Sequence, residues 1–490
     1  MDKDFILALD QGTTSSRSIL FDRKGKIISS ASEEFRQIYS QAAWVEHDPN
    51  DIWQSQLRTA KMVLKESNTD PERVAAIGIT NQRETTIIWD RETGKPIHNA
   101  IVWQCRRTSP MCDALKEAGH ADLVQRKTGL IIDAYFSGTK AAWLLDQVSG
   151  ARKRAERGEL CFGTVDSWLL YNLTGLHQTE PTNACRTMMY NIHEHQWDDE
   201  MLDILRVPRA ILPEVKPTSH VFGETTVLGG AIPVAAMAGD QQAALFGQTA
   251  FERGECKNTY GTGCFLVLNT GAEPVQSHHG LLTTVAWDLD GKVEYALEGS
   301  IFIAGAVIQW LRDELKLIET AAESEAVAKE VPDCNGVSIV PAFVGLGAPH
   351  WDSNARGAIV GLTRGANRSH IVRAALESIA LQSADVLRCM ESDTGVPIRQ
   401  LKVDGGASVN DLLMQFQSDI LDLEVVRGKV SETTALGAAF LAGLAVGVWD
   451  RRESLRGLWE IDRRFTPEWN DQRRKAAINT WQNAVEMVKS

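Results

Sequence analysis

The sequence lacks an apolar run long enough to cross a membrane. Its most apolar window, residues 435–449, is shorter than the roughly 18 residues a transmembrane helix needs and is rich in alanine and glycine. The polar start, residues 1–4, leads directly into a strand-like stretch, and no small-residue cleavage site follows. We therefore expect a buried helix at 435–449, no export signal, no membrane insertion and a cytoplasmic location.

Positive charge is also scarce. The 51 Lys and Arg residues are outnumbered by 64 Asp and Glu, which leaves a formal net charge of −13. The densest basic stretch, residues 152–157, is interrupted by a glutamate and is typical of a solvated helix face. Because a negative chain repels phosphate backbones at long range, we expect no nucleic-acid partner.

Paired cysteines and the common nucleotide-binding loops are absent as well. The eight cysteines form no C-x-x-C pair, so neither a zinc site nor a redox motif is indicated, and reduced thiols are the simplest interpretation. The P-loop pattern does not occur, and the G-x-G at residues 261–263 lacks the third glycine and the helix-opening context of a dinucleotide site.

What is present is an ordinary globular composition, with 43% hydrophobic and 23% charged residues. At roughly 100 to 200 residues per domain, 490 residues predict two to four domains. Residues 5–30 predict a three-strand meander with a Gly-Thr turn, and residues 256–268 predict a second hairpin of the same design. We predict two α/β domains, residues 1–248 and residues 249–490.

Both halves continue with alternating helix-like and strand-like segments. A helical pattern at 51–65 precedes a strand at 74–80, and a helical pattern at 368–391 precedes a strand at 400–403. The halves do not align residue by residue, so the predicted duplication is one of architecture.

The turn at residues 10–17 (DQGTTSSR) supplies a carboxylate, a glycine, four hydroxyls and a cation after a buried strand. These groups suit a polyphosphate with its metal ion. An isolated turn of this composition is also good hairpin chemistry. The matching turn at 261–263 favours phosphate, because two such turns facing each other across a cleft form a clamp.

A third glycine turn, residues 404–410 (DGGASVN), closes a strand and opens a helical pattern at 411–421. Its backbone could lie flat against a planar base, and the helix start would favour an anionic group. Alone, it is equally a simple strand-to-helix turn.

Asp240 lies between an apolar strand pattern at 232–238 and a helical pattern at 243–247. A carboxylate at a strand end beside a cleft is where a general base for a hydroxyl would sit. The alternative is a helix N-cap.

Arg83 and Glu84 lie in a loop between two apolar segments, where both can face one ligand. A fork of donors beside an acceptor suits a small polyol, and an exposed ion pair on a turn is the alternative. Trp103 and Tyr135 are further candidates, although such residues more often belong to a core.

Four stretches resemble the FGGY family of carbohydrate kinases, in the branch that acts on glycerol: residues 10–17, 81–85, 239–248 and 260–265. The resemblance covers essentially the whole chain. Two longer stretches, 135–146 and 357–377, are similar to the two family signatures. The first departs slightly, with Ala141 where a larger apolar residue is usual.

The resemblance implies an α/β, actin-like ATPase fold in which two RNase-H-like domains flank a cleft. It implies a glycerol site in the N-terminal domain and an adenosine site in the C-terminal domain. The implied activity is ATP-dependent phosphorylation of glycerol to sn-glycerol 3-phosphate with Mg²⁺, in glycerol uptake and degradation, by a dimer or tetramer of the chain. Asp240 would accept the proton during in-line transfer.

The glycerol site implied by the resemblance has two kinds of residue, those that hold hydroxyls and those that line the carbon chain. Trp103 and Phe265 would be the walls of the pocket. The full implied set is Arg83, Glu84, Trp103, Tyr135, Asp240, Gln241 and Phe265.

The ATP site implied by the resemblance also has two kinds of residue, those that contact the phosphates and those that contact the nucleoside. Asp10 would act on Mg²⁺. The implied contacts are Thr13, Thr14, Ser15, Arg17 and Thr262 for the phosphates, and Gly305, Gln309, Gly406 and Asn410 for the nucleoside.

The same fold also serves two other functions: a kinase for another sugar or polyol, and an actin-fold ATPase that acts as a chaperone or binding module.

The resemblance also bears on regulation. Family members inhibited by fructose 1,6-bisphosphate carry a Gly-Thr-Arg loop. The matching stretch is 229–233, where Ala231 stands in place of the arginine. We therefore expect weak or absent inhibition by that sugar.

Overall fold

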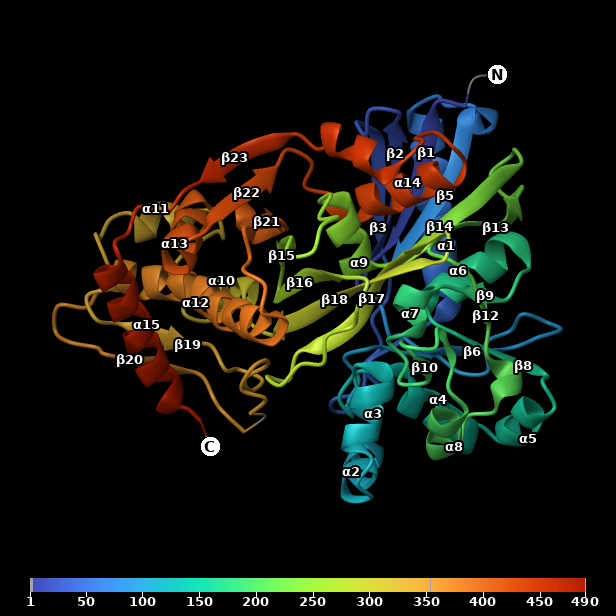
Figure 1. Ribbon diagram of the computed structural model, residues 1–490, viewed down its shortest axis with the longest axis horizontal. Helices are drawn as coiled ribbons and strands as arrows, with labels where there is room; N and C mark the ends of the chain where they lie inside the picture. Colours follow the sequence, from blue (N-terminus) through green and yellow to red (C-terminus); the bar gives the residue numbers. More distant parts are fainter. Residues whose placement is uncertain (1–2, 353, 490) are drawn as a thin grey trace.

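Two mixed β-sheets, one from each half of the chain, organise the structure (Figure 1). The computed structural model describes residues 3–352 and 354–489. The first sheet has the strand order β13-β14-β5-β1-β2-β3. Its strands are β1 (Phe5–Gln11), β2 (Ser15–Asp22), β3 (Ile27–Glu34), β5 (Val74–Asn81), β13 (Ser219–Thr225) and β14 (Ile232–Gly239).

The second sheet has the order β17-β18-β16-β15-β21-β22-β23. Its strands are β15 (Cys256–Tyr260), β16 (Cys264–Gly271), β17 (Leu282–Leu289), β18 (Lys292–Ile301), β21 (Gln400–Asp404), β22 (Glu424–Gly428) and β23 (Ile461–Phe465).

The two sheets repeat one design. In the first, β1, β2 and β3 form an antiparallel meander, and β5 and β14 continue it as strands parallel to β1. In the second, β15, β16 and β18 lie side by side in the same antiparallel order, and β21 and β22 continue parallel to β15. Strand β17, which comes between β16 and β18 in the sequence, is an additional edge strand beside β18. The antiparallel strands β13 and β23 close corresponding edges. The predicted α/β class, the meander at 5–30 and the hairpin at 256–268 are confirmed.

Helices connect and cover the strands. In the first half they are α1 (Pro49–Glu66), α2 (Ser109–Glu117), α3 (Ala121–Thr128), α4 (Ser137–Gln147), α5 (Ala151–Glu156), α6 (Val165–Thr174), α7 (Pro181–Ala184), α8 (Asp199–Leu205) and α9 (Asp240–Gly247), with short turns η1 (Pro71–Arg73) and η2 (Arg209–Ile211). In the second half they are α10 (Gly305–Asp313), α11 (Glu323–Ala328), α12 (Arg368–Thr394), α13 (Asp411–Leu421), α14 (Thr433–Ala445) and α15 (Asp471–Glu486), with η3 (Gly406–Val409) and η4 (Arg452–Gly457).

Short strand pairs complete the fold outside the two sheets. They are β4 (Glu46–His47) with β7 (Ala100–Ile101), β6 (Ile87–Asp90) with β8 (Leu160–Gly163), β9 (Gln178–Thr179) with β12 (Glu214–Val215), β10 (Tyr190–Asn191) with β11 (Gln196–Trp197), and β19 (Ser338–Val340) with β20 (Ala358–Val360).

Helix α14 comes from the C-terminal half of the chain but packs with α9 against the first sheet, where Figure 1 shows it in red beside the blue strands. The two helices meet backbone to backbone. A Cβ atom at Gly437 would lie 1.8 Å from the carbonyl oxygen of Ala243, and one at Gly247 would lie 2.0 Å from that of Thr433. Only glycine fits at these two contacts, which fix the position of α9.

The helix expected at 435–449 is therefore present and buried, although α14 begins and ends earlier, at Thr433 and Ala445. None of the described helices is both long and apolar enough to span a bilayer.

Strand register places the motifs at matching edges of the two sheets. Strands β1, β5 and β14 run parallel, with Gln11 paired to Asn81 and Asn81 paired to Gly239. In the second sheet Thr259 of β15 pairs with Asp404 of β21. The parallel strands of each sheet have their carboxyl ends on the same side, so the loops that follow them bring together residues that are far apart in the sequence.

The boundary predicted at residue 248 falls between α9 and β15. Because α14 crosses back to the first sheet, the range 249–490 contributes to the core of the first half. The division into residues 1–248 and 249–490 stays a prediction.

Candidate functional site

Arg83 and Glu84 lie in the loop that follows β5, and both are buried, with 2% and 1% of their surface exposed. Glu84 has a positive φ of 61°, so the chain turns sharply at this point. The Nε atom of Arg83 lies 3.2 Å from Oδ1 of Asp240. The interpretation of this pair as an exposed ion pair on a turn is wrong, because the side chains are enclosed beside Asp240.

Asp240 is the first residue of α9, and the N-cap position belongs to Gly239. The interpretation of Asp240 as a helix cap is therefore wrong. Its side chain accepts a hydrogen bond from the backbone N–H of Gln241 at 2.8 Å and remains 32% exposed. Burial raises the pKa of Asp240, while the guanidinium of Arg83 opposes that rise. A partly exposed carboxylate with a raised pKa has the properties of a general base.

Lys257, on β15, connects two further predicted site residues. Its buried ammonium donates to Oε1 of Gln241, to Oγ1 of Thr259 at 2.9 Å and to the backbone carbonyl of Phe265 at 3.2 Å. Lys257 lies outside every motif predicted from the sequence. One buried cation thus holds Gln241 and the backbone of Phe265 in fixed positions.

Arg186 and Glu298 are two more buried charged residues that no sequence motif predicts. Arg83 donates to both carboxylate oxygens of Glu298, at 2.5 and 3.0 Å. Arg186 donates to Glu84 at 2.6 Å and to Glu298 at 2.9 Å. Although burial raises the pKa of Glu298, the cations Arg186 and Arg83 bring it down to about 2. The strand at 293–299 contains two glutamates, Glu294 and Glu298, and nothing in the sequence marks Glu298 as the buried one.

Trp103 and Tyr135 are half-buried and lie edge to face, with ring centroids 5.6 Å apart. The indole N–H of Trp103 donates to Oγ1 of Thr13 at 3.0 Å. Buried Lys140 donates to the backbone carbonyls of Ala134, at 3.1 Å, and of Tyr135. Trp103 therefore touches the predicted phosphate turn, which links the two parts of the candidate site.

The turn between β1 and β2 is closed by a hydrogen bond from the N–H of Gly12 to the carbonyl of Ser15, at 2.9 Å. Thr14 is exposed, and Thr13 and Ser15 are half-buried. Arg17 forms an ion pair with Glu432, the residue that precedes α14. A phosphate group at this turn would compete with Glu432 for the guanidinium.

The turn between β15 and β16 packs on the start of α10. Gly261 and Gly263 close it with a 2.9 Å hydrogen bond, and exposed Thr262 accepts through its carbonyl from the N–H of Ala304 at 2.8 Å. A Cβ atom at Gly305 would lie 2.6 Å from the carbonyl of Gly261, so this contact requires glycine. Gln309 is exposed one turn farther along α10.

The turn after β21 needs glycine at residue 405, where φ is +86° and a Cβ atom would lie 2.5 Å from the carbonyl of Tyr260. Gly406 is exposed with open space around it. Asn410 caps α13, because its Oδ1 accepts from the N–H of Leu413 at 3.0 Å. The strand-to-helix interpretation of this turn is correct, and it leaves Gly406 accessible to a ligand.

Asp10, the residue predicted to act on Mg²⁺, lies next to the end of β1. Burial is the largest cause that raises the pKa of its carboxyl; with Arg17 lowering it and the carboxylates of Glu432 and Asp240 raising it, the pKa is about 7. Within residues 3–352 and 354–489 no cluster of three or more His, Cys, Asp or Glu side chains could form a complete metal cage. A site with the carboxylate of Asp10 and no complete protein cage fits Mg²⁺, which commonly binds one or two carboxylates together with water and substrate phosphates.

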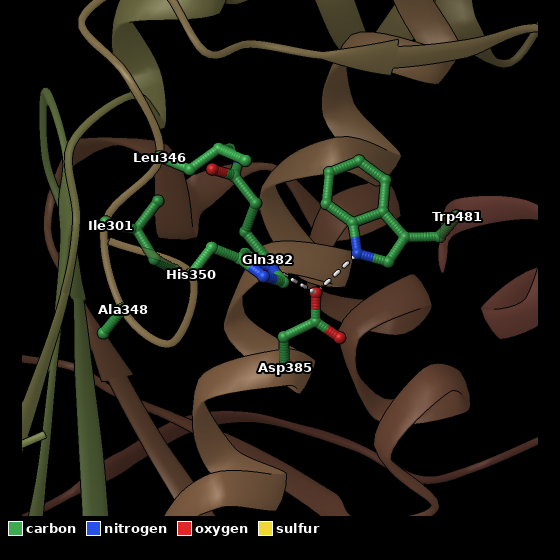
Figure 2. A pocket seen from close by; sticks show the side chains of 8 residues that line it. Ile301, Leu346, Ala348, His350, Gln382, Asp385 and Trp481 are labelled. Carbon is green, nitrogen blue, oxygen red and sulfur yellow. Dashed lines mark hydrogen bonds and ion pairs between the residues drawn. The ribbon is translucent and has the colours of Figure 1, made fainter. Parts of the chain in front are cut away.

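A small cavity elsewhere in the second half lies between α12, α15 and the loop at 346–350 (Figure 2). The indole N–H of Trp481 donates to Oδ2 of Asp385 at 2.6 Å, and Nε2 of His350 lies 3.9 Å from the same oxygen. These contacts fasten the C-terminal helix to α12, and no predicted site residue is among them.

Comparison with known proteins identifies the family of the chain. The model of the FGGY family of carbohydrate kinases, N-terminal domain, matches residues 5–247, and that of the C-terminal domain matches residues 256–446. Glycerol kinase of Caldanaerobacter subterraneus subsp. tengcongensis is 61% identical, and glycerol kinase 2 of Thermotoga maritima is 60% identical, each over 98% of both chains.

A solved structure is similar over its whole length. The crystal structure of Plasmodium falciparum glycerol kinase with ADP matches 99% of this chain and 98% of its own, with a TM-score of 0.94 at 38% identity. The resemblance predicted from the motifs and the predicted two-domain fold are confirmed. The chain belongs to the FGGY family of carbohydrate kinases.

Proposed function

We propose that this protein transfers the terminal phosphoryl group of ATP to glycerol, giving sn-glycerol 3-phosphate and ADP. The observation that carries the proposal is the contact of Arg83 with Asp240, which brings a polyol-binding fork to the side of a general base. Relatives that are about 60% identical over nearly their whole length are glycerol kinases. The similar structure of the Plasmodium falciparum enzyme contains ADP, which supports ATP as the phosphoryl donor.

Recognition of glycerol would use groups that are already fixed in place. Arg83, Glu84, Asp240 and Gln241 would hold the hydroxyls, and their neighbours leave them little freedom to rearrange. Trp103, Tyr135 and Phe265 would line the carbon chain. Preorganised donors and acceptors lower the entropic cost of binding a small, flexible substrate.

The chemical step needs a deprotonated Asp240. Its carboxylate would accept the proton of a terminal glycerol hydroxyl as that oxygen attacks the γ-phosphorus in line. The bond from the γ-phosphorus to the bridging oxygen breaks, and ADP leaves with that oxygen. Because phosphoryl transfer depends mainly on positioning and charge neutralisation, the fixed geometry around Arg83 supports the reaction.

The phosphates would lie between the two glycine turns, and Asp10 would hold Mg²⁺. When bound, Mg²⁺ neutralises negative charge on the phosphate oxygens. Arg17 would exchange Glu432 for a phosphate, which keeps its charge compensated both with and without nucleotide. The phosphates would contact Thr13, Thr14, Ser15, Arg17 and Thr262, and the nucleoside would contact Gly305, Gln309, Gly406 and Asn410.

ADP release measured with glycerol, with a panel of pentuloses and pentitols, and without any acceptor distinguishes the candidate functions. We expect strong acceptor-dependent release with glycerol. Release that depends equally on a pentulose would favour another sugar kinase. Release that is independent of every acceptor would favour the ATPase module.

Family resemblance also supports assembly as a dimer or tetramer and a cytoplasmic role in glycerol uptake and degradation. Light scattering tests the assembly, since a monomer at micromolar concentration would contradict it.

A further inference from the structure

Four buried charged side chains form a closed ring, and two of them, Arg83 and Glu84, belong to the candidate glycerol site. Arg83 binds Glu298 through both Nη atoms, and Glu298 also accepts from Arg186. Arg186 in turn donates to Glu84, whose Oε1 lies 3.8 Å from Nε of Arg83. Each of the four side chains is at most 1% exposed. The ring contains two cations and two carboxylates, so its charge is balanced.

The ring joins the two sheets. Arg83 and Glu84 follow β5 of the first sheet, and Arg186 follows the short helix α7. Glu298 lies in β18 of the second sheet, where it is paired with Val267 of β16. A residue from the second half of the chain therefore completes the support of a pair from the first half.

Glu298 determines which edge of Arg83 faces Asp240. The Nη atoms are occupied by Glu298, and Nη1 also donates to Oε1 of Gln242 at 3.1 Å. The Nε edge is left facing Asp240. Because a guanidinium is planar, anchoring one edge fixes the direction of the whole fork.

Arg186 has the same effect on Glu84. It holds Oε1 of Glu84, and in the described part of the chain Oε2 has no hydrogen-bond partner. The guanidinium of Arg186 lies over the rings of Tyr135 and Phe136, at 5.6 and 5.3 Å from their centroids. These contacts fix the carboxylate of Glu84 with one oxygen available to a hydroxyl.

We propose that Arg186 and Glu298 are positioning residues for glycerol, which orient Arg83 and Glu84 without touching the substrate. The proposal rests on the proposed function. A buried ionic ring is a poor source of stability, since well-packed apolar residues often serve as well. Its geometry instead gives Arg83 and Glu84 one orientation each, which a small substrate with three hydroxyls requires.

The test compares Glu298→Gln with Glu294→Gln in the full-length protein. Both residues lie on β18 and pair with an arginine, but Glu294 pairs with Arg452, away from the ring. The measurements are the KM for glycerol, the KM for ATP, kcat and the melting temperature. We expect Glu298→Gln to raise the KM for glycerol at least tenfold and to change the KM for ATP less than twofold. Glu294→Gln should leave both unchanged.

Conservative variants separate positioning from folding. Glu298→Asp and Arg186→Lys keep each charge but shorten or reshape the contact. We expect each to raise the KM for glycerol about fivefold or more, with Glu298→Asp closer to the parent than Glu298→Gln. These two variants decide the question if Glu298→Gln does not fold.

Two results would overturn the proposal. One is an unchanged KM for glycerol in folded Glu298→Gln or in both conservative variants. The other is an equal rise in the KM values for glycerol and ATP, which would indicate a general structural defect. ADP release by the parent with glycerol is measured first, so that failure of the proposed function is recognised separately from failure of the positioning role.

Discussion

Replacing Asp240 with asparagine removes the base and little else. Asparagine keeps the shape of the side chain, and its Oδ1 can still accept from the N–H of Gln241. Arg83 remains paired with Glu298, so no buried cation loses its only partner. We therefore expect Asp240→Asn to fold with a melting temperature within a few degrees of the parent.

The rate should fall steeply. A positioned general base contributes roughly 10²- to 10⁴-fold. That range corresponds to about 2.7–5.4 kcal/mol in the activation barrier, at about 1.36 kcal/mol per tenfold change in rate. A coupled assay of ADP release at saturating glycerol and ATP measures the loss in kcat. Asp313→Asn is the control, because Asp313 is an exposed carboxylate at the end of α10 and pairs with its neighbour Arg312.

The pH profile provides a second arm of the same experiment. The base works only when deprotonated, so the rate of the parent should fall as the pH drops through the raised pKa of Asp240, above the ordinary value of 3.8. The remaining rate of Asp240→Asn should lack that acid limb. Activity of the variant within threefold of the parent would refute the assignment of Asp240 as the base.

Three further predictions concern the pocket wall, regulation and packing. Phe265→Ala should raise the KM for glycerol about tenfold and should bring the rate with a pentitol closer to the rate with glycerol. A parent protein that phosphorylates both polyols at equal rates would contradict the steric role of Phe265. Fructose 1,6-bisphosphate should inhibit weakly or not at all, because the loop around Ala231 offers no arginine to bind a phosphate, and strong inhibition in a sub-millimolar titration would point to a different binding loop. Gly437→Ala should destabilise the fold by about 1–3 kcal/mol or more in a denaturant titration, since the new Cβ would overlap the carbonyl of Ala243. Gly457→Ala, where a Cβ has open space, should change stability little, and equal effects of the two substitutions would argue against the close helix contact.

The sequence was sufficient where function depends on local pattern. Glycine turns after apolar strands were recognisable, and the helix at 411–421 begins and ends where its pattern predicted. The pattern predicts the start of α9 three residues late, because the apolar pattern begins at Ala243 whereas the helix already begins at Asp240. Polar residues in a first helical turn are not distinguishable from a preceding loop by periodicity alone.

The residues that support the site were not predictable in the same way. Glu298 lies 215 positions from Arg83 in the sequence, and Lys257 appears as one charged residue in a short strand. Nothing local tells a buried, paired charge in a strand from an exposed one. The same reason explains why Arg83 and Glu84 could be interpreted as an exposed pair. Burial depends on contacts between strands that only the assembled sheets provide.

Identification of the phosphorylated product tests the central claim most directly. The protein is incubated with glycerol, ATP and Mg²⁺, and the product is analysed by phosphorus NMR together with a stereospecific enzymatic assay for sn-glycerol 3-phosphate. We predict that this compound forms in amounts equal to the ADP released. ADP release without sn-glycerol 3-phosphate, or formation of a different phosphorylated polyol in preference to it, would contradict the account.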